Sequence, residues 1–299
     1  MTKGLNMAKL EINLGNVTVD NYSQPYFIAE IGINHNGDMQ IVKKLIDASF
    51  ATNWDCVKFQ KRTPEIAVPD SQKNIIRSTP WGEMTYLEYK KKIELGKGEY
   101  DEIDRYCKEK PIAWTASPWD LPSLEFLLEY DVPFIKIASA MNQNDEIIRT
   151  IGKSGKPIVL STGMSTWDEI DKSVDLLEKY TDGNYILLHT NSVYPTPTDH
   201  LNLRMIQSLK NRYHCLVGYS GHEENLEPTV IAAALGACII ERHVTLSHNM
   251  WGSDQKASLE VHAMDLLHKR INDIKLMLGD GDKKLSNEEM SKRIALRGN

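Results

Sequence analysis

Short apolar runs rich in β-branched residues recur along the chain, and stretches with helical spacing lie between them. Eight such runs can be read: Tyr26–Ile31, Cys56–Gln60, Ile112–Thr115, Phe134–Ala138, Ile158–Ser161, Tyr185–His189, Leu216–Tyr219 and Cys238–Glu241. Apolar positions at helical spacing fall in residues 38–51, 120–130, 167–180, 226–235 and 263–278. Strands that alternate with helices predict a parallel sheet.

Eight strand–helix units within about 250 residues favour a closed (β/α)₈ TIM barrel. A doubly wound open sheet is the structural alternative, although no GxGxxG motif follows a strand. Two segments fall outside the repeat. Residues 7–21 are typical of a β-hairpin with a Gly-Asn turn, which could plug the bottom of the barrel. Residues 62–100 form a long insertion after the second strand, of the kind that builds lids or binding loops. We predict one domain over residues 1–299.

Composition narrows the possible partners and the compartment. The chain has 35 basic and 41 acidic residues, for a net charge of −6, which argues against nucleic acid or an anionic membrane as the main partner. No apolar run approaches the roughly 18 residues of a membrane span, and no signal-peptide pattern opens the chain. The four cysteines form no CxxC pair, which is typical of reduced thiols. We therefore expect a cytoplasmic protein.

Polar residues collect where the predicted strands end, which is where such barrels place their active sites. Two lysines are the most informative, because a lysine inside a barrel strand costs several kcal/mol if it is unpaired. Lys58 and Lys136 are both flanked by apolar residues, so we expect an anionic ligand, a phosphate or a carboxylate, between them. Serines could add hydroxyl donors at positions 117, 139, 161 and 220. Two alternatives remain open. Each lysine could pair with Glu30 or Glu241, or Lys136 could be the Schiff-base lysine of an aldolase.

Two histidines follow the last two predicted strands. His222 and His243 end neighbouring strands, and adjacent strand ends lie roughly 5 Å apart. Two imidazoles at that separation can share a divalent ion, with water or substrate in the other positions. Glu241 lies on the same face as His243. The alternatives are a general base or a hydrogen-bonded structural histidine.

Taken together, these strand ends resemble those of the sialic acid synthases, also called N-acetylneuraminate or nonulosonic acid synthases. The matching motifs run in order from about residue 10 to 280. They are Ile28–Gly37 (IAEIGINHNG), Val57–Gln60 (VKFQ), Lys136–Ser139 (KIAS), Leu160–Met164 (LSTGM), Tyr194–Pro197 (YPTP), Gly218–His222 (GYSGH), Glu241–His243 (ERH) and Asp254–Leu259 (DQKASL). Each motif is weak alone, and the set is specific.

The resemblance implies a (β/α)₈ barrel that condenses phosphoenolpyruvate with an N-acyl hexosamine such as N-acetylmannosamine, giving a nine-carbon 2-keto acid and phosphate. The residues implied to hold phosphoenolpyruvate are Lys58, Ser117, Lys136, Ser139, Ser161 and Ser220. His222 and His243 would hold a divalent ion, Mn²⁺ foremost, with Mg²⁺ or Co²⁺ as alternatives. The residues expected near the substrates also include Glu30, Gln60, Ser192, Tyr194, Glu241 and Asp254. The expected catalytic group is Glu30, Lys58, Lys136 and His243, and either Glu30 or a metal-bound water would move protons.

Three departures from the family pattern concern the sugar side. The family usually has an acidic residue shortly after the Ser139 position, where this chain has Met141. Ser192 stands where an asparagine is common, with Asn191 one place earlier. Many members also carry a C-terminal antifreeze-like domain that supplies an arginine to the partner subunit. Here we expect the barrel alone, with that arginine absent or replaced from the 62–100 insertion, and a homodimer that lacks this support.

These departures predict a retained donor and an acceptor sugar that differs from N-acetylmannosamine. A barrel that has lost activity and serves as an interaction scaffold is a further alternative. Decay of a site should remove its costliest residues first. The two lysines, the two histidines and Glu30 all remain, which argues against the scaffold.

Overall fold

Eight parallel strands surround the interior of the molecule. The structure is a computed structural model that describes residues 8–298. The strands are β3 (Tyr26–Gly32), β4 (Cys56–Lys61), β7 (Ala113–Pro118), β8 (Ile135–Ile137), β9 (Ile158–Ser161), β10 (Tyr185–Thr190), β11 (Leu216–Gly221) and β12 (Ile239–Thr245). They pair in the order β7-β4-β3-β12-β11-β10-β9-β8. At the remaining seam the Thr115 hydroxyl of β7 donates to the Phe134 carbonyl beside β8, at 2.6 Å. The expected (β/α)₈ barrel is confirmed.

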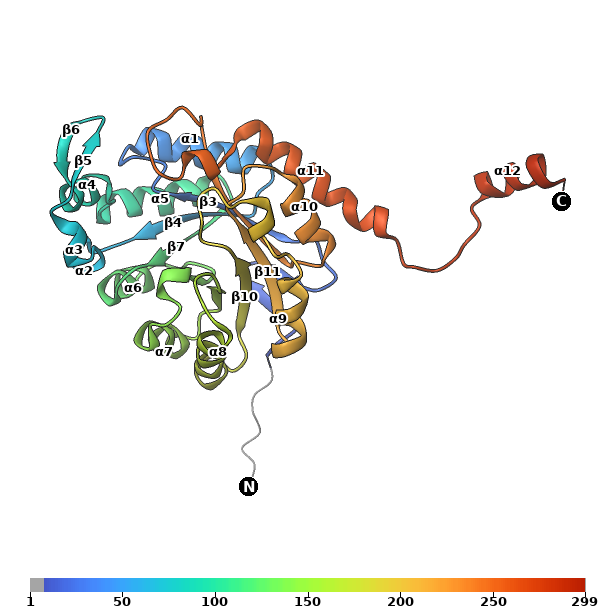
Figure 1. Cartoon of the computed structure of the whole chain (residues 1–299), viewed down its shortest axis with the longest axis horizontal. Helices are drawn as coiled ribbons and strands as arrows, with labels where there is room; N and C mark the ends of the chain where they lie inside the picture. The colour runs from blue at the N-terminus through green and yellow to red at the C-terminus, as the bar shows by residue number, and fades with distance from the viewer. Residues whose placement is uncertain (1–7, 299) are drawn as a thin grey trace, which may run out of the picture.

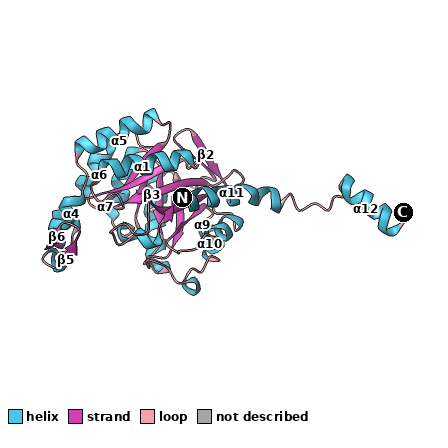
Figure 2. Ribbon diagram, turned by 90° about the horizontal axis from the view of Figure 1, so that it is seen from above, coloured by secondary structure: helices cyan, strands magenta, loops and turns pink. Residues whose placement is uncertain are grey.

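Helices cover the outside of the barrel (Figures 1 and 2). They are α1 (Met39–Ala51), α5 (Lys97–Glu109), α6 (Leu121–Leu128), α7 (Asp145–Ser154), α8 (Trp167–Thr181), α9 (Met205–Tyr213), α10 (Glu227–Ala234) and α11 (Val261–Leu278). Capping side chains fix where they begin, as at α8, where Thr166 and Glu169 form a capping box. The periodicity had predicted five of these helices; α5, α7 and α9 were not predicted.

The N-terminal hairpin closes one end of the barrel. β1 (Glu11–Leu14) and β2 (Val17–Asp20) pair antiparallel across a turn at Gly15 and Asn16. Gly15 has a φ of +64°, a conformation that glycine adopts without strain. Ile12, Leu14 and Val19 are buried in one apolar cluster with the first inward-facing residues of the barrel strands. The hairpin therefore lies as a plug against the N-terminal ends of the strands.

The long insertion after β4 is folded and lies at the edge of the barrel (Figure 1). It contains α2 (Pro64–Ala67), α3 (Asp70–Lys73), the antiparallel pair β5 (Ile76–Thr79) and β6 (Gly82–Thr85), and α4 (Tyr86–Ile93). Tyr89 and Ile93 of α4 are buried together with Ile33 of the loop after β3, and Trp251 packs against them. Apolar packing therefore holds α4 beside the loops at the C-terminal ends of the strands.

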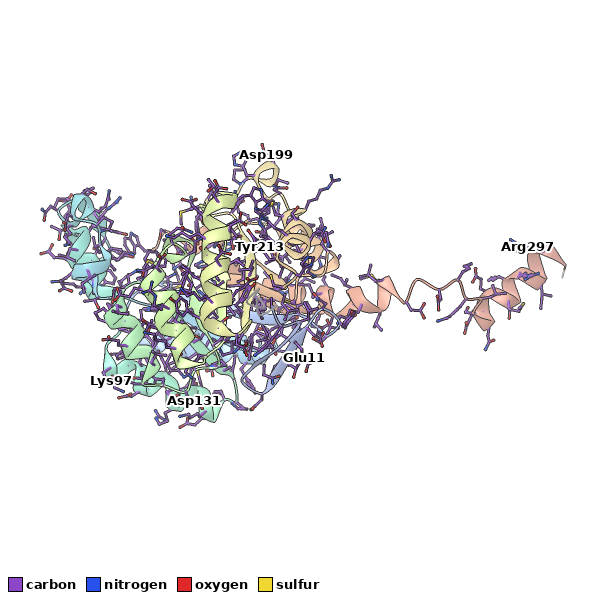
Figure 3. All side chains as sticks on the ribbon, turned by 90° about the horizontal axis from the view of Figure 1, so that it is seen from below. Glu11, Lys97, Asp131, Asp199, Tyr213 and Arg297 are labelled. Carbon is purple, nitrogen blue, oxygen red and sulfur yellow. The ribbon has the colours of Figure 1, made fainter. Side chains whose placement is uncertain are left out.

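Inward-facing positions change from apolar to polar along each strand. Because side chains alternate between two faces, every second residue points into the barrel. In β3 the inward series is Tyr26, Ile28 and Glu30, and in β4 it is Cys56, Lys58 and Gln60, with the earlier residues in the apolar cluster under the hairpin. The interior of the barrel is therefore apolar next to the hairpin and polar at the other end. Figure 3 shows Asp199, from the loop after β10, on the opposite side of the molecule from Asp131 and Glu11.

The remaining elements are short or lie at the end of the chain. They are the turns η1 (Ser139–Met141), η2 (Thr198–His200) and η3 (Gln255–Ala257), strand β13 (Leu259–Glu260) beside β12, and helix α12 (Asn287–Arg297). α12 buries none of its residues and extends away from the barrel, with Arg297 near its tip (Figure 3). Within residues 8–298, no helix combines the length and apolar character needed to span a bilayer.

Candidate active site

Two lysines and two glutamates form the deepest polar layer of the barrel. Lys58 Nζ lies 2.5 Å from Glu30 Oε2 and 3.7 Å from Glu241 Oε1. Lys136 Nζ lies 3.8 Å from the same Glu241 oxygen and donates to Ser161 Oγ at 2.7 Å. All four side chains are at most 6% exposed. Both lysines therefore have an internal carboxylate near them, which was one of the alternatives read from the sequence.

The two lysines differ in how firmly they hold their protons. Burial disfavours the charged form of Lys58, but Glu241 and Glu30 outweigh it and hold its pKa above the usual value. Burial dominates at Lys136 and lowers its pKa to about 8, because Glu241 compensates only in part and the Lys58 charge repels it. Lys58 therefore holds its proton firmly, whereas Lys136 gives its proton up more readily but remains mostly charged at neutral pH, about one unit below its pKa.

A pocket of about 170 Å³ opens directly above this layer. The predicted site residues that line it are Glu30, Lys58, Gln60, Ser117, Lys136, Ser139, Ser161, Ser192, Tyr194, His222, Glu241 and His243. Ser220 lies behind the lining and donates to Glu241 Oε1 at 3.0 Å. Asp254 lies beside the pocket, with Oδ2 at 3.8 Å from His243 Nδ1. Most of the residues predicted at the strand ends therefore line one cavity, although they come from distant segments of the chain.

Several residues of the pocket were not singled out from the sequence. Trp119, Thr190 and Met164 add to its wall. Gly163 fits between two serines, since a Cβ there would lie 2.5 Å from Ser192 Oγ and 2.6 Å from Ser139 Oγ. The Gly163 position in the LSTGM motif could have signalled this close approach, because only glycine leaves room for it. Met141, in contrast, packs against the hydrophobic core and is not part of the lining.

His222 and His243 meet above the lysines, with ring centroids 5.4 Å apart. The Tyr194 hydroxyl lies between them, 2.6 Å from His222 Nε2 and 3.5 Å from His243 Nε2. His222 Nδ1 lies 2.5 Å from the carbonyl oxygen of Asn191, which fixes the proton on Nδ1 and leaves the Nε2 lone pair to accept from the Tyr194 hydroxyl or to bind an ion. Burial, followed by the neighbouring His243, lowers the pKa of His222 well below its usual value, so its imidazole is neutral.

This donor set fits a divalent ion. Neutral imidazoles are the form that ligates metal, and a backbone carbonyl on the other nitrogen is the common outer contact of such a ligand. Two further buried polar atoms, Glu241 Oε2 and His243 Nδ1, have no hydrogen-bond partner among residues 8–298. No group of three or more His, Cys, Asp or Glu side chains forms a ready metal cage in the part of the chain described. Water or substrate would have to complete the coordination, as in sites that keep an open position.

A buried ion pair fixes the strand ends that carry the histidines. Glu223 follows His222 and Arg242 precedes His243, and Arg242 Nη1 lies 3.0 Å from Glu223 Oε1. Arg242 is fully buried and also donates to Thr229 Oγ1 at 2.8 Å. Tyr219 donates to the other Glu223 oxygen at 2.8 Å. The pair therefore ties β11 to β12 directly behind the imidazoles.

Replacing Arg242 with methionine is expected to lower the free energy of unfolding by about 3–5 kcal/mol, because Glu223 would remain buried without its cation. Chemical denaturation measures this difference. Arg212→Met is the matched control, since Arg212 pairs with Asp171 at the surface, where such pairs contribute about 0–1 kcal/mol. Equal losses in the two variants would contradict the structural role of the buried pair.

His35, in the turn after β3, gives the fold a pH-sensitive component. It is 3% exposed, and burial lowers its pKa to about 4, against 6.5 for an ordinary histidine. Between these values the unfolded chain binds a proton that the native state does not, so stability rises with pH in this window and falls as the pH drops through it.

We expect His35 to contribute roughly 2 kcal/mol to the loss of stability between pH 7 and pH 5, at 1.36 kcal/mol per pKa unit. Denaturation curves at both pH values, for the native chain and for His35→Gln, measure this contribution as a difference of slopes. Other buried histidines change the stability of the native chain and of the variant alike. The difference between the two slopes of stability against pH therefore reports His35. An unchanged slope in the variant would contradict it.

Comparison with known proteins places this site in a family. The NeuB family model matches residues 45–283. The N,N'-diacetyllegionaminic acid synthase of Campylobacter jejuni is 38% identical over 267 residues, which cover 88% of this chain and 80% of that protein. The human N-acetylneuraminate-9-phosphate synthase is 35% identical over 283 residues, 91% of this chain and 78% of that protein.

A solved structure agrees with these relatives. The N-acetylneuraminic acid synthetase of Leptospira borgpetersenii, in complex with citrate, superposes with a TM-score of 0.84 at 31% identity. The match covers 98% of this chain and 99% of that chain. By sequence, fold and strand-end motifs, the chain belongs to the NeuB family of nonulosonic acid synthases.

Proposed function

We propose that this enzyme condenses phosphoenolpyruvate with the open-chain aldehyde of an N-acyl hexosamine, giving a nine-carbon 2-keto acid and phosphate. The observation that carries the proposal is the layering of the pocket. Buried cations and hydroxyl donors lie at its floor, and an imidazole pair lies above them. That order suits a small anion below and a carbonyl group above it.

The floor is suited to phosphoenolpyruvate. Lys58 and Lys136 supply two ammonium groups, and Ser117, Ser139 and Ser161 supply hydroxyls around them. Lys58 Nζ donates to Ser117 Oγ at 3.3 Å, which orients both groups before a ligand arrives. Donors fixed in a buried site stabilise charge more strongly than water does, because they need no reorganisation. These ammonium and hydroxyl groups would hold phosphoenolpyruvate and stabilise the phosphate as it leaves.

The imidazole pair is where the acceptor aldehyde would lie. His222 and His243 would hold a divalent ion, Mn²⁺ foremost, and the Tyr194 hydroxyl would face the same point. A bound ion would supply a Lewis acid for the aldehyde oxygen. Asp254 beside His243 and Gln60 beside Glu30 would face the sugar.

Bond changes follow from this arrangement. C3 of phosphoenolpyruvate attacks the aldehyde carbon, which forms the new C–C bond. Cationic charge develops at C2, water adds there, and the C–O bond to phosphate breaks. Glu30 would take the proton of that water, since its carboxylate forms an ion pair with Lys58, accepts from Gln60 at 2.8 Å and lines the pocket.

Two further points belong to the proposal. The four cysteines are all buried and free of disulfides, which supports a reducing cytoplasmic compartment. An N-acyl hexosamine as the acceptor is supported by the relatives named as legionaminic, neuraminic and pseudaminic acid synthases.

Phosphate release tests the proposal. The enzyme with Mn²⁺ and phosphoenolpyruvate is expected to release phosphate only when an N-acyl hexosamine is present, and a chelator should stop the reaction. Release that ignores the sugar, or that survives the chelator, would contradict the respective part of the proposal.

A Schiff-base aldolase acting through Lys136 is the second candidate, favoured by the lowered pKa of that amine. Borohydride reduction in the presence of pyruvate separates the two. A covalent adduct on Lys136 would support the aldolase, whereas the condensation with phosphoenolpyruvate forms no imine.

A further inference from the structure

One loop surrounds the His222 imidazole. The loop after β10, residues 191–196, places the Asn191 carbonyl oxygen 2.5 Å from Nδ1 and the Tyr194 hydroxyl 2.6 Å from Nε2. The Thr196 amide donates to the His222 carbonyl oxygen at 3.0 Å. Both ring nitrogens and the main chain of an expected metal ligand are therefore engaged by the same short segment.

The direction of these hydrogen bonds follows from the chemistry of the partners. A carbonyl oxygen can only accept, so Nδ1 of His222 carries a proton and donates it to Asn191. In the neutral imidazole the other ring nitrogen is then an acceptor. The Tyr194 hydroxyl therefore donates to Nε2. This bond uses the one lone pair through which His222 could bind an ion.

The second imidazole faces the same hydroxyl. His243 Nε2 lies 3.5 Å from the Tyr194 oxygen, and the Tyr194 ring stacks on that of His222 with the centroids 3.9 Å apart. The hydroxyl thus lies against both nitrogens that would hold an ion. A metal ion takes the lone pair of each imidazole that ligates it. The ion and the hydrogen bond from Tyr194 to His222 therefore exclude each other.

Tyr194 can turn away while the rest of its loop stays in place. The residue is 42% exposed, and within residues 8–298 its hydroxyl has no hydrogen-bond partner besides the two imidazoles. The contacts of Asn191 and Thr196 use other atoms of His222, so they survive when Nε2 changes its partner. Rotation of one side chain is therefore enough to free the lone pair.

We propose that Tyr194 closes the ion site, so that a divalent ion has to displace its hydroxyl from His222 before the two histidines can hold the ion. This inference rests on the metal site of the proposed function and adds a competitor to it. Tyr194 also lines the pocket, so the displaced hydroxyl remains beside the place of the acceptor sugar. The hydroxyl is then available to the sugar only after the ion has bound.

Calorimetric titration with Mn²⁺ alone tests the competition. Tyr194→Phe keeps the ring and removes the hydroxyl, so it should bind Mn²⁺ about 3- to 10-fold more tightly than the native enzyme, the range that one net hydrogen bond represents. Tyr213→Phe is the matched control, since Tyr213 of α9 donates to Asp171 Oδ1 at 2.7 Å, outside the pocket lining. It should bind Mn²⁺ as the native enzyme does.

A near-ultraviolet difference spectrum reports the displacement itself. Mn²⁺ changes the partner of one tyrosine hydroxyl, so the native enzyme and Tyr213→Phe should show a tyrosine difference band that saturates with the ion. Tyr194→Phe should lack this band. A cooperative thermal transition in each variant shows that it is folded.

Three outcomes would overturn the inference. Weaker binding of Mn²⁺ by Tyr194→Phe would make the hydroxyl a ligand of the ion and not its competitor. Equal binding by Tyr194→Phe and the native enzyme would show that the hydroxyl does not compete. In both cases the metal site of the proposed function stands. Absence of Mn²⁺ binding in the native enzyme and in the variant would remove that metal site, and the inference with it.

Discussion

Lys136→Met is expected to lower kcat/KM for phosphoenolpyruvate by about 10³-fold, in the range found when one preorganised donor is removed from a buried charged site. Methionine keeps the length of the stem, so the packing around β8 should survive, and Glu241 would still have Lys58 and Ser220 near it. The loss should affect the binding of phosphoenolpyruvate and not that of the sugar. Binding of phosphoenolpyruvate weakens, while KM for the sugar stays close to its native value.

Calorimetry with phosphoenolpyruvate and steady-state kinetics with both substrates check this result. Lys156→Met is the matched control, because Lys156 is a partly buried lysine that donates to the Val132 carbonyl at 2.8 Å, away from the pocket. Unchanged donor binding in Lys136→Met would remove Lys136 from the phosphoenolpyruvate site.

His222→Ala is expected to abolish tight binding of Mn²⁺ and to reduce activity by more than about 10³-fold, since the Lewis acid for the aldehyde is lost with the ion. Metal content after dialysis gives a readout that does not depend on turnover. Tyr194→Phe removes the hydroxyl between the imidazoles and keeps both nitrogens, so it should retain the metal.

His248→Ala is a second control for this experiment. His248 lies 3.7 Å from Glu260, and its side chain is half exposed, outside the pocket lining. It should keep both metal and activity. Full metal content in His222→Ala would show that the ion, if present, is held elsewhere.

The sequence predicted the barrel and the deep part of the site because both follow from local patterns. Alternation within a strand places Lys58 and Gln60 on one face, and the strand-end rule brings Lys136, His222 and His243 to the same end of the barrel. These positions need no knowledge of the loops. The sequence pattern left open whether the two lysines pair with internal carboxylates, because pairing with Glu30 and Glu241 depends on side-chain geometry.

The mouth of the site could not be predicted in the same way. Arg62 opens an insertion whose path is set by α4 packing on Ile33 and Trp251, far away in the sequence. Helix α5 was missed because the insertion was extended to residue 100, inside that helix. The contact of Asn142 with Ser161 O, at 3.1 Å, likewise joins two strand ends across loops that carry no regular pattern.

The hairpin plug imposes an order of events. Because Ile12, Leu14 and Val19 pack against the barrel below the lysine layer, the pocket is closed at the hairpin end in the part of the chain from residue 8 to 298, and ligands enter from the C-terminal ends of the strands. A ligand at the floor has to arrive before the ligand at the mouth and leave after it. For a two-substrate reaction in such a well, the deep substrate is the obligatory first one, and saturating amounts of the second substrate trap it inside. Isotope-trapping of bound phosphoenolpyruvate would register this commitment directly.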